Sequence, residues 1–161
     1  MSNPNFEKAL DFIHEIGIET GFTTLAGNQC FLPGLLVEKG RILIDRDKMY
    51  YPGDILHEAA HIALVPSSER SLLDGETIGK RKDAAAEEMA ALAWTYAACI
   101  HMKIDPHFVF HEDGYKGDGA SLVENFEAGR WVGVPILQWL GMTGKPGDAY
   151  AFPKMIKWKR D

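Results

Sequence analysis

The stretch that decides the fold is Ile55-Leu56-His57-Glu58-Ala59-Ala60-His61-Ile62-Ala63-Leu64. Apolar residues flank its polar ones on both sides and Pro66 follows closely, so the pattern predicts a largely buried helix from about Ile55 to Val65. Residues four apart on a helix are separated by ~40° around its axis, with Cβ atoms ~6 Å apart. His57 and His61 therefore point the same way and can reach one metal ion.

Zinc is the metal that this pair favours. Zinc accepts imidazole nitrogen at ~2.0–2.1 Å and prefers four ligands, so His57 and His61 would fill half of its coordination shell. Glu58 lies ~100° around the helix from His57, where its carboxylate suits a general base that takes a proton from a zinc-bound water. The alternative is a solvated helix, but a buried His-Glu-His group without a cation would be costly. We therefore predict a zinc-dependent hydrolase with Glu58 as its catalytic residue.

A third ligand is expected from a second helix, predicted over Asp83–Lys103 from its many good helix formers. Its apolar residues at core spacing are Met89, Leu92, Tyr96, Cys99 and Ile100. Glu88 continues this stripe, whereas Glu87 lies nearer the flank, so we prefer Glu88 as the metal ligand and keep Glu87 as the alternative. A solvated first turn in which both glutamates face water stays open. The acids next in order are Asp74, Glu76 and Asp83.

These motifs resemble those of the ImmA/IrrE-type metallopeptidases, a zincin group whose third ligand is a glutamate. The chain presents a strand at Ile42–Ile44, then the His-Glu-Ala-Ala-His helix, then Glu87-Glu88-Met89-Ala90-Ala91-Leu92-Ala93. Members of the group commonly read His-Glu-Leu-Gly-His and, later, Glu-Ala-Asn-x-Phe-Ala. The resemblance covers roughly residues 41–102. It implies a zincin-like fold and a peptidase activity, with His57, His61 and Glu88 as zinc ligands and Glu58 as the base.

Two positions depart from the family pattern. Ala60 stands where the family has glycine, which is a mild change. Ala90 stands where the family has asparagine, which removes a polar neighbour of the third ligand.

Weaker signals place the other elements. We expect helices over Asn5–Ile18, Ser121–Trp131 and Pro135–Leu140, short strands and turns between Gly21 and Gly40, and the clearest strand at Arg41–Asp45. Asp54 is the expected N-cap of the helix that carries His57 and His61. The segments Ser67–Lys82 and His107–Gly119 are expected to be mostly loop. Helices outnumber strands and the strands cluster early, so the class is α+β: one domain, 1–161, with a small antiparallel or mixed sheet packed against several helices.

Composition narrows the class of partner. The chain has 161 residues, 46% of them hydrophobic, and a net charge of −6, so no basic excess exists to neutralise nucleic-acid phosphates. No signal peptide is evident, and no apolar run reaches the ~20 residues of a membrane helix. Cys30 and Cys99 are too few for a disulfide framework, and Cys99 is expected to be a buried thiol. We expect a cytoplasmic protein that acts on peptides or proteins.

Several alternatives stay open. The zinc could be structural or sensory, with a fourth ligand from His101, His107, His111 or a loop acid, or the chain could be a degenerate zincin without activity. A separate metal site at these three histidines with Glu112 is less favoured than surface or capping roles. An oxyanion donor could be Tyr96, Tyr115 or Tyr150, and nothing selects among them. The strand Arg41–Asp45 is expected beside the cleft, where it could pair with an extended substrate.

Overall fold

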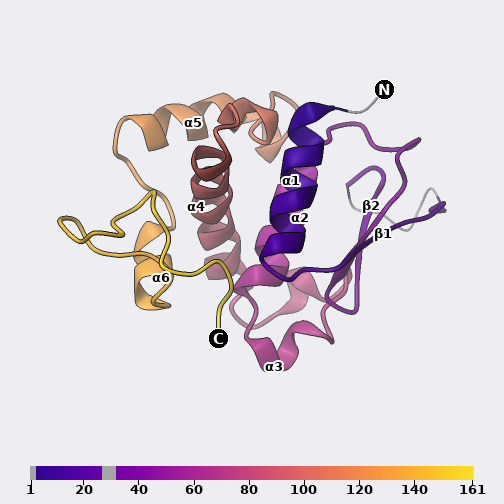
Figure 1. Cartoon of the computed structure of the whole chain (residues 1–161), viewed down its shortest axis with the longest axis horizontal. Coiled ribbons are helices and arrows are strands. Elements are labelled where there is room, and N and C mark those ends of the chain that lie inside the picture. The colour runs from indigo at the N-terminus through magenta and orange to yellow at the C-terminus, as the bar shows by residue number, and fades with distance from the viewer. Residues whose placement is uncertain (1–2, 27–31) are drawn as a thin grey trace.

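The computed structural model describes residues 3–26 and 32–161. Its helices are α1 (Pro4–Glu15), α2 (Asp54–Leu64), α3 (Ser67–Arg70), α4 (Ala84–Met102), α5 (Gly119–Glu127) and α6 (Val134–Trp139), with 3-10 turns η1 (Ile78–Lys80), η2 (Pro106–Phe108) and η3 (Tyr115–Gly117). The strands are β1 (Thr20–Phe22), β2 (Leu35–Glu38) and β3 (Arg41–Ile44). Figure 1 shows α1, α2 and α4 in the middle, the strands on one side and α5 and α6 on the other. The architecture is α+β with a small mixed sheet, as predicted.

The sheet has the order β1-β3-β2, with β1 parallel and β2 antiparallel to β3. The β2–β3 hairpin turns at Lys39 and Gly40, whose φ angles of 52° and 73° match the two-residue turns that suit twisted hairpins. The expected strand Arg41–Asp45 is β3, which ends at Ile44 and is the central strand. Both edges of β3 are paired, so the expectation that it binds a substrate backbone is wrong. The outer strands of the sheet are β1 and β2.

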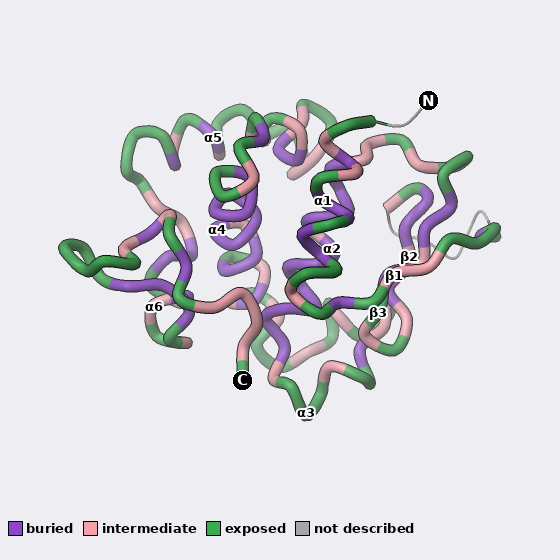
Figure 2. Tube along the Cα trace, viewed as in Figure 1, coloured by how far each residue is buried: buried purple, intermediate pink, exposed green. Residues whose placement is uncertain are grey.

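Helices α2 and α4 form the centre of the core. Every residue of α2 except His57 is buried, in agreement with the apolar flanks of its motif. Helix α4 packs against α2 and is buried on most sides, as the purple tube of Figure 2 shows for both helices. Many of its buried residues are small: Ala90, Ala91, Ala93, Ala97 and Ala98. Small side chains let the two helix backbones approach closely, so residues on α2 and α4 can share one site.

The apolar stripe expected on α4 is only partly correct. Tyr96 and Cys99 are buried, but Met89 and Ile100 are 45% and 41% exposed. Because alanines and Trp94 fill the inward face, large side chains that share the helix can remain outside. Burial also raises the pKa of the Cys99 thiol to about 12, as expected for a buried cysteine.

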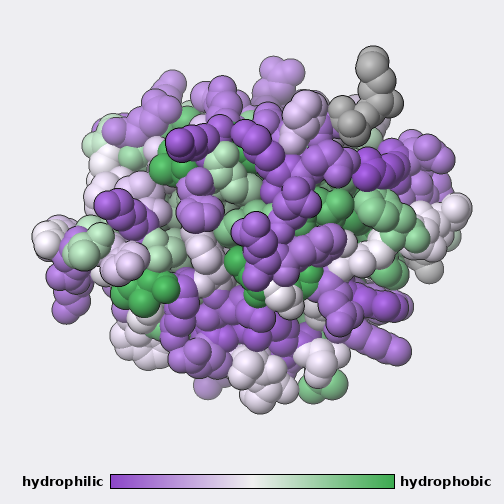
Figure 3. Space-filling view, in the orientation of Figure 1, coloured by the Kyte–Doolittle hydropathy of each residue, from purple (hydrophilic) through white to green (hydrophobic). Residues whose placement is uncertain are grey.

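Other boundaries differ from the expectations in detail. Gly53, not Asp54, is the N-cap of α2, and Asp54 is its first helical residue. The segment expected to be loop after α2 contains the short α3 and η1, and α5 ends at Glu127 rather than near Trp131. Cys30 and the turn expected at Gly27-Asn28 lie outside the described residues. No helix within the described ranges is long and apolar enough to cross a membrane. On the face shown in Figure 3, hydrophilic residues predominate between small apolar patches.

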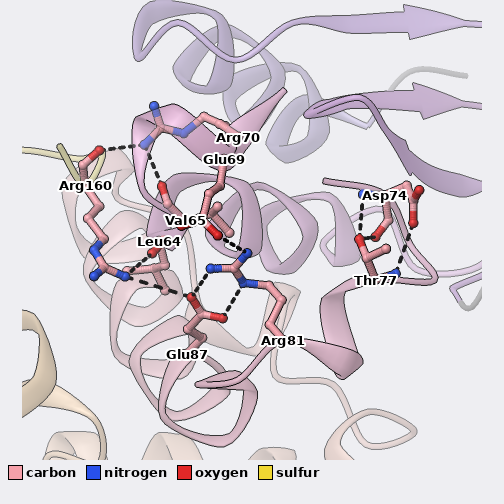
Figure 4. Close-up of polar contacts among 9 residues, drawn as sticks. All are labelled: Leu64, Val65, Glu69, Arg70, Asp74, Thr77, Arg81, Glu87 and Arg160. Atoms are coloured by element: carbon pink, nitrogen blue, oxygen red, sulfur yellow. Dashed lines mark hydrogen bonds and ion pairs between the residues drawn. The ribbon is translucent and has the colours of Figure 1, made fainter. Parts of the chain in front are cut away.

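Two arginines hold the C-terminal end of α2 (Figure 4). Arg70 donates from Nε to the Ile62 carbonyl at 3.0 Å and from Nη2 to the Val65 carbonyl at 2.9 Å. Arg160 donates from its backbone N–H to the Ala63 carbonyl at 2.8 Å. The last carbonyls of a helix have no partner within the helix, and a positive charge there also complements the helix dipole. The chain's last residues therefore fix the helix that carries both histidines.

The start of α2 provides a test of this packing. A Cβ built on Gly53 would lie 1.9 Å from the Phe108 carbonyl oxygen, whereas one on Gly79 would meet nothing within 4 Å. We expect Gly53→Ala to lower stability by about 1–3 kcal/mol through backbone overpacking, which thermal unfolding would record as a fall of roughly 3–10 °C. Gly79→Ala is the matched control and should leave the melting temperature nearly unchanged. Equal melting temperatures for the two variants would contradict the tight approach at Gly53.

Candidate metal centre

The structure brings His57, His61 and Glu88 together. The two Nε2 atoms of the histidines lie 3.1 Å apart, and Glu88 Oε2 lies 2.9 Å from His61 Nε2. Glu88 Oε1 lies 3.6 Å from His57 Nε2, and the imidazole rings are nearly perpendicular at 84°. Within the described ranges, this is the group of three potential ligands whose atoms all converge, within 4.8 Å of one another. The predicted trio of ligands therefore meets at one point between α2 and α4.

The donor set fits zinc. Two imidazole nitrogens and one carboxylate are a usual protein ligand set for a zinc ion that keeps a fourth position open for water or substrate. Ligands bound tetrahedrally at ~2.1 Å lie about 3.4 Å from one another, close to the separations of 3.1, 2.9 and 3.6 Å among these atoms. A metal could therefore be held with small side-chain adjustments and no movement of either helix.

The electrostatics of the trio leave two of its three groups in forms that can bind a cation. Burial and the neighbouring His61 charge lower the pKa of His57 to about 4. Burial also disfavours a charge on His61, but the hydrogen bond and the charge of Glu88 outweigh it and raise the pKa of His61. Burial opposes ionisation of Glu88 too, yet the hydrogen bond to His61 lowers the pKa of Glu88. One neutral imidazole and an ionised carboxylate at neutral pH are forms that a metal can bind directly.

Glu58 lies beside the trio with a different environment. Glu58 is 8% exposed and lines the same cleft as His57 and His61. Desolvation by burial raises the pKa of Glu58 to about 7, although the charge of His61 acts in the opposite direction. A carboxyl group whose pKa lies near neutral can both accept and return a proton at physiological pH, as a general base requires. Its position and its proton affinity agree with the predicted role.

The two adjacent glutamates of α4 have separate partners. Glu87 is 8% exposed and forms a two-point ion pair with Arg81, with Nε–Oε1 at 2.8 Å and Nη2–Oε2 at 3.1 Å (Figure 4). Arg160 Nη1 lies 4.0 Å from the same carboxylate. The side chain of Glu88 is 44% exposed and faces the histidines. The preference for Glu88 thus agrees with the geometry, but its argument was wrong, because Glu87 is the more deeply buried of the two.

Tyr115 contacts the site from the loop before α5. Its hydroxyl lies 3.0 Å from His57 Nδ1, and the two rings meet edge to face with centroids 5.5 Å apart. Sequence reasoning considered Tyr115 only as an oxyanion donor and could not choose it. Among the other two tyrosines considered, Tyr96 stacks on Phe126 in the core and Tyr150 is 57% exposed. Tyr115 is therefore the one of the three that touches a histidine of the trio.

The remaining histidines have other partners. His111 Nε2 lies 2.7 Å from Asp54 Oδ1 in a buried pair, which sequence reasoning missed because 57 residues separate them. His107 hydrogen-bonds Asp105 at the start of η2, as a capping role predicts. His101 packs against Phe12 and Trp158. These contacts favour structural roles over a second metal site.

The acids kept in reserve as third ligands, Asp74, Glu76 and Asp83, do not join the converging trio, although Asp74 and Glu76 line the same cleft. Asp74 Oδ1 accepts from the backbone N–H groups of Glu76 and Thr77 and so closes its own turn. Figure 4 shows the contact between Asp74 and Thr77. Asp83 occupies the N-cap position of α4. Neither belongs to the converging group.

The trio opens into a cleft of about 1110 Å³. One wall is β2, and the other consists of the segment from Asp74 to Lys80, with the histidines, Glu58 and Glu88 between them. The volume slightly exceeds the upper range of about 300–1,000 Å³ typical of small-molecule pockets.

No protein-family model, curated protein or solved structure matches this chain significantly. The resemblance to the ImmA/IrrE-type metallopeptidases therefore stays a prediction from the sequence. The geometry of the trio is the evidence on which a function has to be proposed.

The adjacent glutamates allow a sharp test of the third ligand. We expect Glu88→Ala to weaken zinc binding by more than about 100-fold, because losing a ligand should exceed the 10–100-fold effect of losing an outer partner. Glu87→Ala should change zinc affinity little, but it should lower stability by roughly 1.5–3 kcal/mol, since it breaks charge-assisted hydrogen bonds to Arg81. Zinc titration against a chromophoric chelator and denaturant unfolding measure the two effects. Equal zinc affinities in the two variants would reject Glu88 as the ligand.

Proposed function

We propose that the protein is a zinc-dependent hydrolase that cleaves peptide bonds. The observation that carries this proposal is the convergence of His57 Nε2, His61 Nε2 and the Glu88 carboxylate on one point at the floor of a cleft, with Glu58 beside them. A site with three protein ligands leaves a position for water, which is the arrangement of catalytic rather than structural zinc. The motif's resemblance to zincin peptidases supports the choice of the peptide bond.

Each residue then has one task. His57, His61 and Glu88 would hold the ion. Zinc, when bound, supplies a Lewis acid that polarises a carbonyl and lowers the pKa of a bound water toward 7. Glu58 takes the proton of the attacking water and returns it to the leaving amine, which a carboxyl group with a pKa of about 7 can do in both directions.

The edge of β2 supports an extended substrate. In an antiparallel pair, successive residues direct their backbone groups alternately toward and away from the partner strand. The backbone groups of Leu35 and Val37 point away from β3. The Val37 carbonyl already accepts a hydrogen bond from Gly75 N–H at 2.9 Å. The Val37 N–H and the Leu35 carbonyl face the same side. A peptide lying in the cleft could pair with these two groups, in the place that the sequence had assigned to β3.

A structural zinc module is the less supported function. It needs a fourth protein ligand, and the three histidines considered for that role are engaged at Asp54, Asp105 and the Phe12–Trp158 cluster. The core around α2 and α4 is also made of apolar side chains, whose burial supplies stability of its own. A degenerate, inactive zincin is distinguished by the activity measurement below.

Replacing one carboxylate oxygen of Glu58 by an amide nitrogen tests its role as the general base. We expect Glu58→Gln to bind zinc as the unaltered protein does and to lose at least ~100-fold in hydrolysis rate, the scale of general-base catalysis. His57→Ala should lose both zinc and activity. The assay follows release of labelled peptides from unfolded casein by the zinc-loaded protein, with bound zinc counted in the same samples.

The control is Glu124→Gln, an exposed glutamate of α5 outside the cleft. It should match the unaltered protein in both readouts. Full hydrolysis by Glu58→Gln would contradict the mechanism. Zinc binding without hydrolysis in the unaltered protein would favour the binding module, and neither property would favour the degenerate zincin.

A further inference from the structure

The loop His111–Tyr115 touches α2 at its first turn and at His57, although it follows α2 by more than forty residues in the sequence. The Tyr115 hydroxyl lies 3.0 Å from His57 Nδ1, on the opposite edge of the imidazole from the Nε2 atom that faces the trio. A hydroxyl can donate or accept a hydrogen bond, so the position of the His57 proton decides the direction of this contact.

The trio itself determines where that proton sits. The Glu88 carboxylate accepts hydrogen bonds only, so His61 Nε2, 2.9 Å away, must carry a proton and donate it. His57 Nε2 lies 3.1 Å from the same protonated nitrogen. Two N–H groups facing each other at this distance would repel, so His57 Nε2 presents a lone pair. The proton of the neutral His57 ring is then on Nδ1, where Tyr115 accepts it.

From these contacts we infer that Tyr115 is a positioning residue, whose hydroxyl accepts from His57 Nδ1–H and holds the ring with its Nε2 lone pair aimed at the metal position before any metal binds. This inference rests on the proposed zinc site. Metal-binding histidines usually donate their second nitrogen to an outer partner that fixes the tautomer and ring orientation. Here a phenol takes that place.

The surroundings hold the phenol in place. Tyr115 has a φ of 57°, a left-handed conformation that non-glycine residues seldom adopt, so the loop retains a costly backbone geometry at this residue. His111 stacks on Tyr51 with centroids 3.7 Å apart and pairs with Asp54, which anchors the loop on α2. A phenol is ordinarily uncharged near neutral pH, so Tyr115 orients His57 without adding negative charge to the site.

The substitution Tyr115→Phe removes the hydroxyl and keeps the ring. We expect zinc affinity to fall roughly 10–100-fold, as measured by chelator competition, since this is the usual effect of losing an outer partner of a metal ligand. The matched control is Tyr96→Phe, which removes a hydroxyl from a tyrosine that stacks on Phe126 in the core and should leave zinc affinity unchanged. Unfolding curves of both variants establish that each is folded under the conditions of the titration.

A second readout needs neither zinc nor activity. Nitrogen-15 spectra of the imidazole rings in the metal-free protein at neutral pH should show His57 as the Nδ1–H tautomer, with its signals assigned by their loss in His57→Gln. In Tyr115→Phe the same ring should become a mixture of tautomers. A purely packing role for Tyr115 would leave the tautomer unaltered.

The outcomes separate this inference from the proposed function. A His57 ring that is Nε2–H in the unaltered metal-free protein, or a Tyr115→Phe variant with full zinc affinity and an unchanged tautomer, would overturn the role of Tyr115 even if Glu58-dependent hydrolysis were observed. Conversely, a Tyr115-dependent zinc affinity in a protein that hydrolyses no peptide would uphold the positioning role while the peptidase proposal failed.

Discussion

The packing of α2 against α4 is the contact on which the rest of the structure depends. Both helices are rich in buried alanines, and small residues allow a close approach that larger side chains would prevent. That approach lets a glutamate in the first turns of α4 lie 2.9 Å from a histidine on α2. The sheet, the arginines Arg70 and Arg160, and the loop carrying Tyr115 all act by holding this pair of helices and their side chains in place.

Different partners explain how the two neighbouring glutamates at the start of α4 take different roles. Glu87 points into the protein and is neutralised by Arg81, so its burial is compensated within the fold. Glu88 points to the cleft, where its ion-pair partners among the described residues are the two histidines. The first carboxylate stabilises the helix junction, and the second is left for a cation. A zinc ion would satisfy the same three groups that otherwise must share protons among themselves.

Local patterns predicted much of this arrangement. The His-Glu-x-x-His spacing, the apolar flanks and the helix formers after residue 83 are properties of a single helix, and helices α2 and α4 formed where these patterns indicated. The prediction for the inward face of α4 was partly wrong because it considered large apolar residues, whereas the small residues Ala90, Ala93 and Ala97 are fully buried. The choice of Glu88 agreed with the geometry although its argument ranked burial wrongly. The Asp54–His111 and His57–Tyr115 contacts could not be predicted, since they join segments whose approach is set by the whole chain.

The central claim is that His57, His61 and Glu88 together hold one zinc ion with an open position. Crystals of the zinc-loaded protein, measured on both sides of the zinc absorption edge, test it most directly. The account predicts a single anomalous peak, bonded to Nε2 of both histidines and to the Glu88 carboxylate, with solvent at the remaining position and Tyr115 still hydrogen-bonded to His57. A peak elsewhere, a fourth protein ligand, or no bound metal at saturating zinc would contradict it.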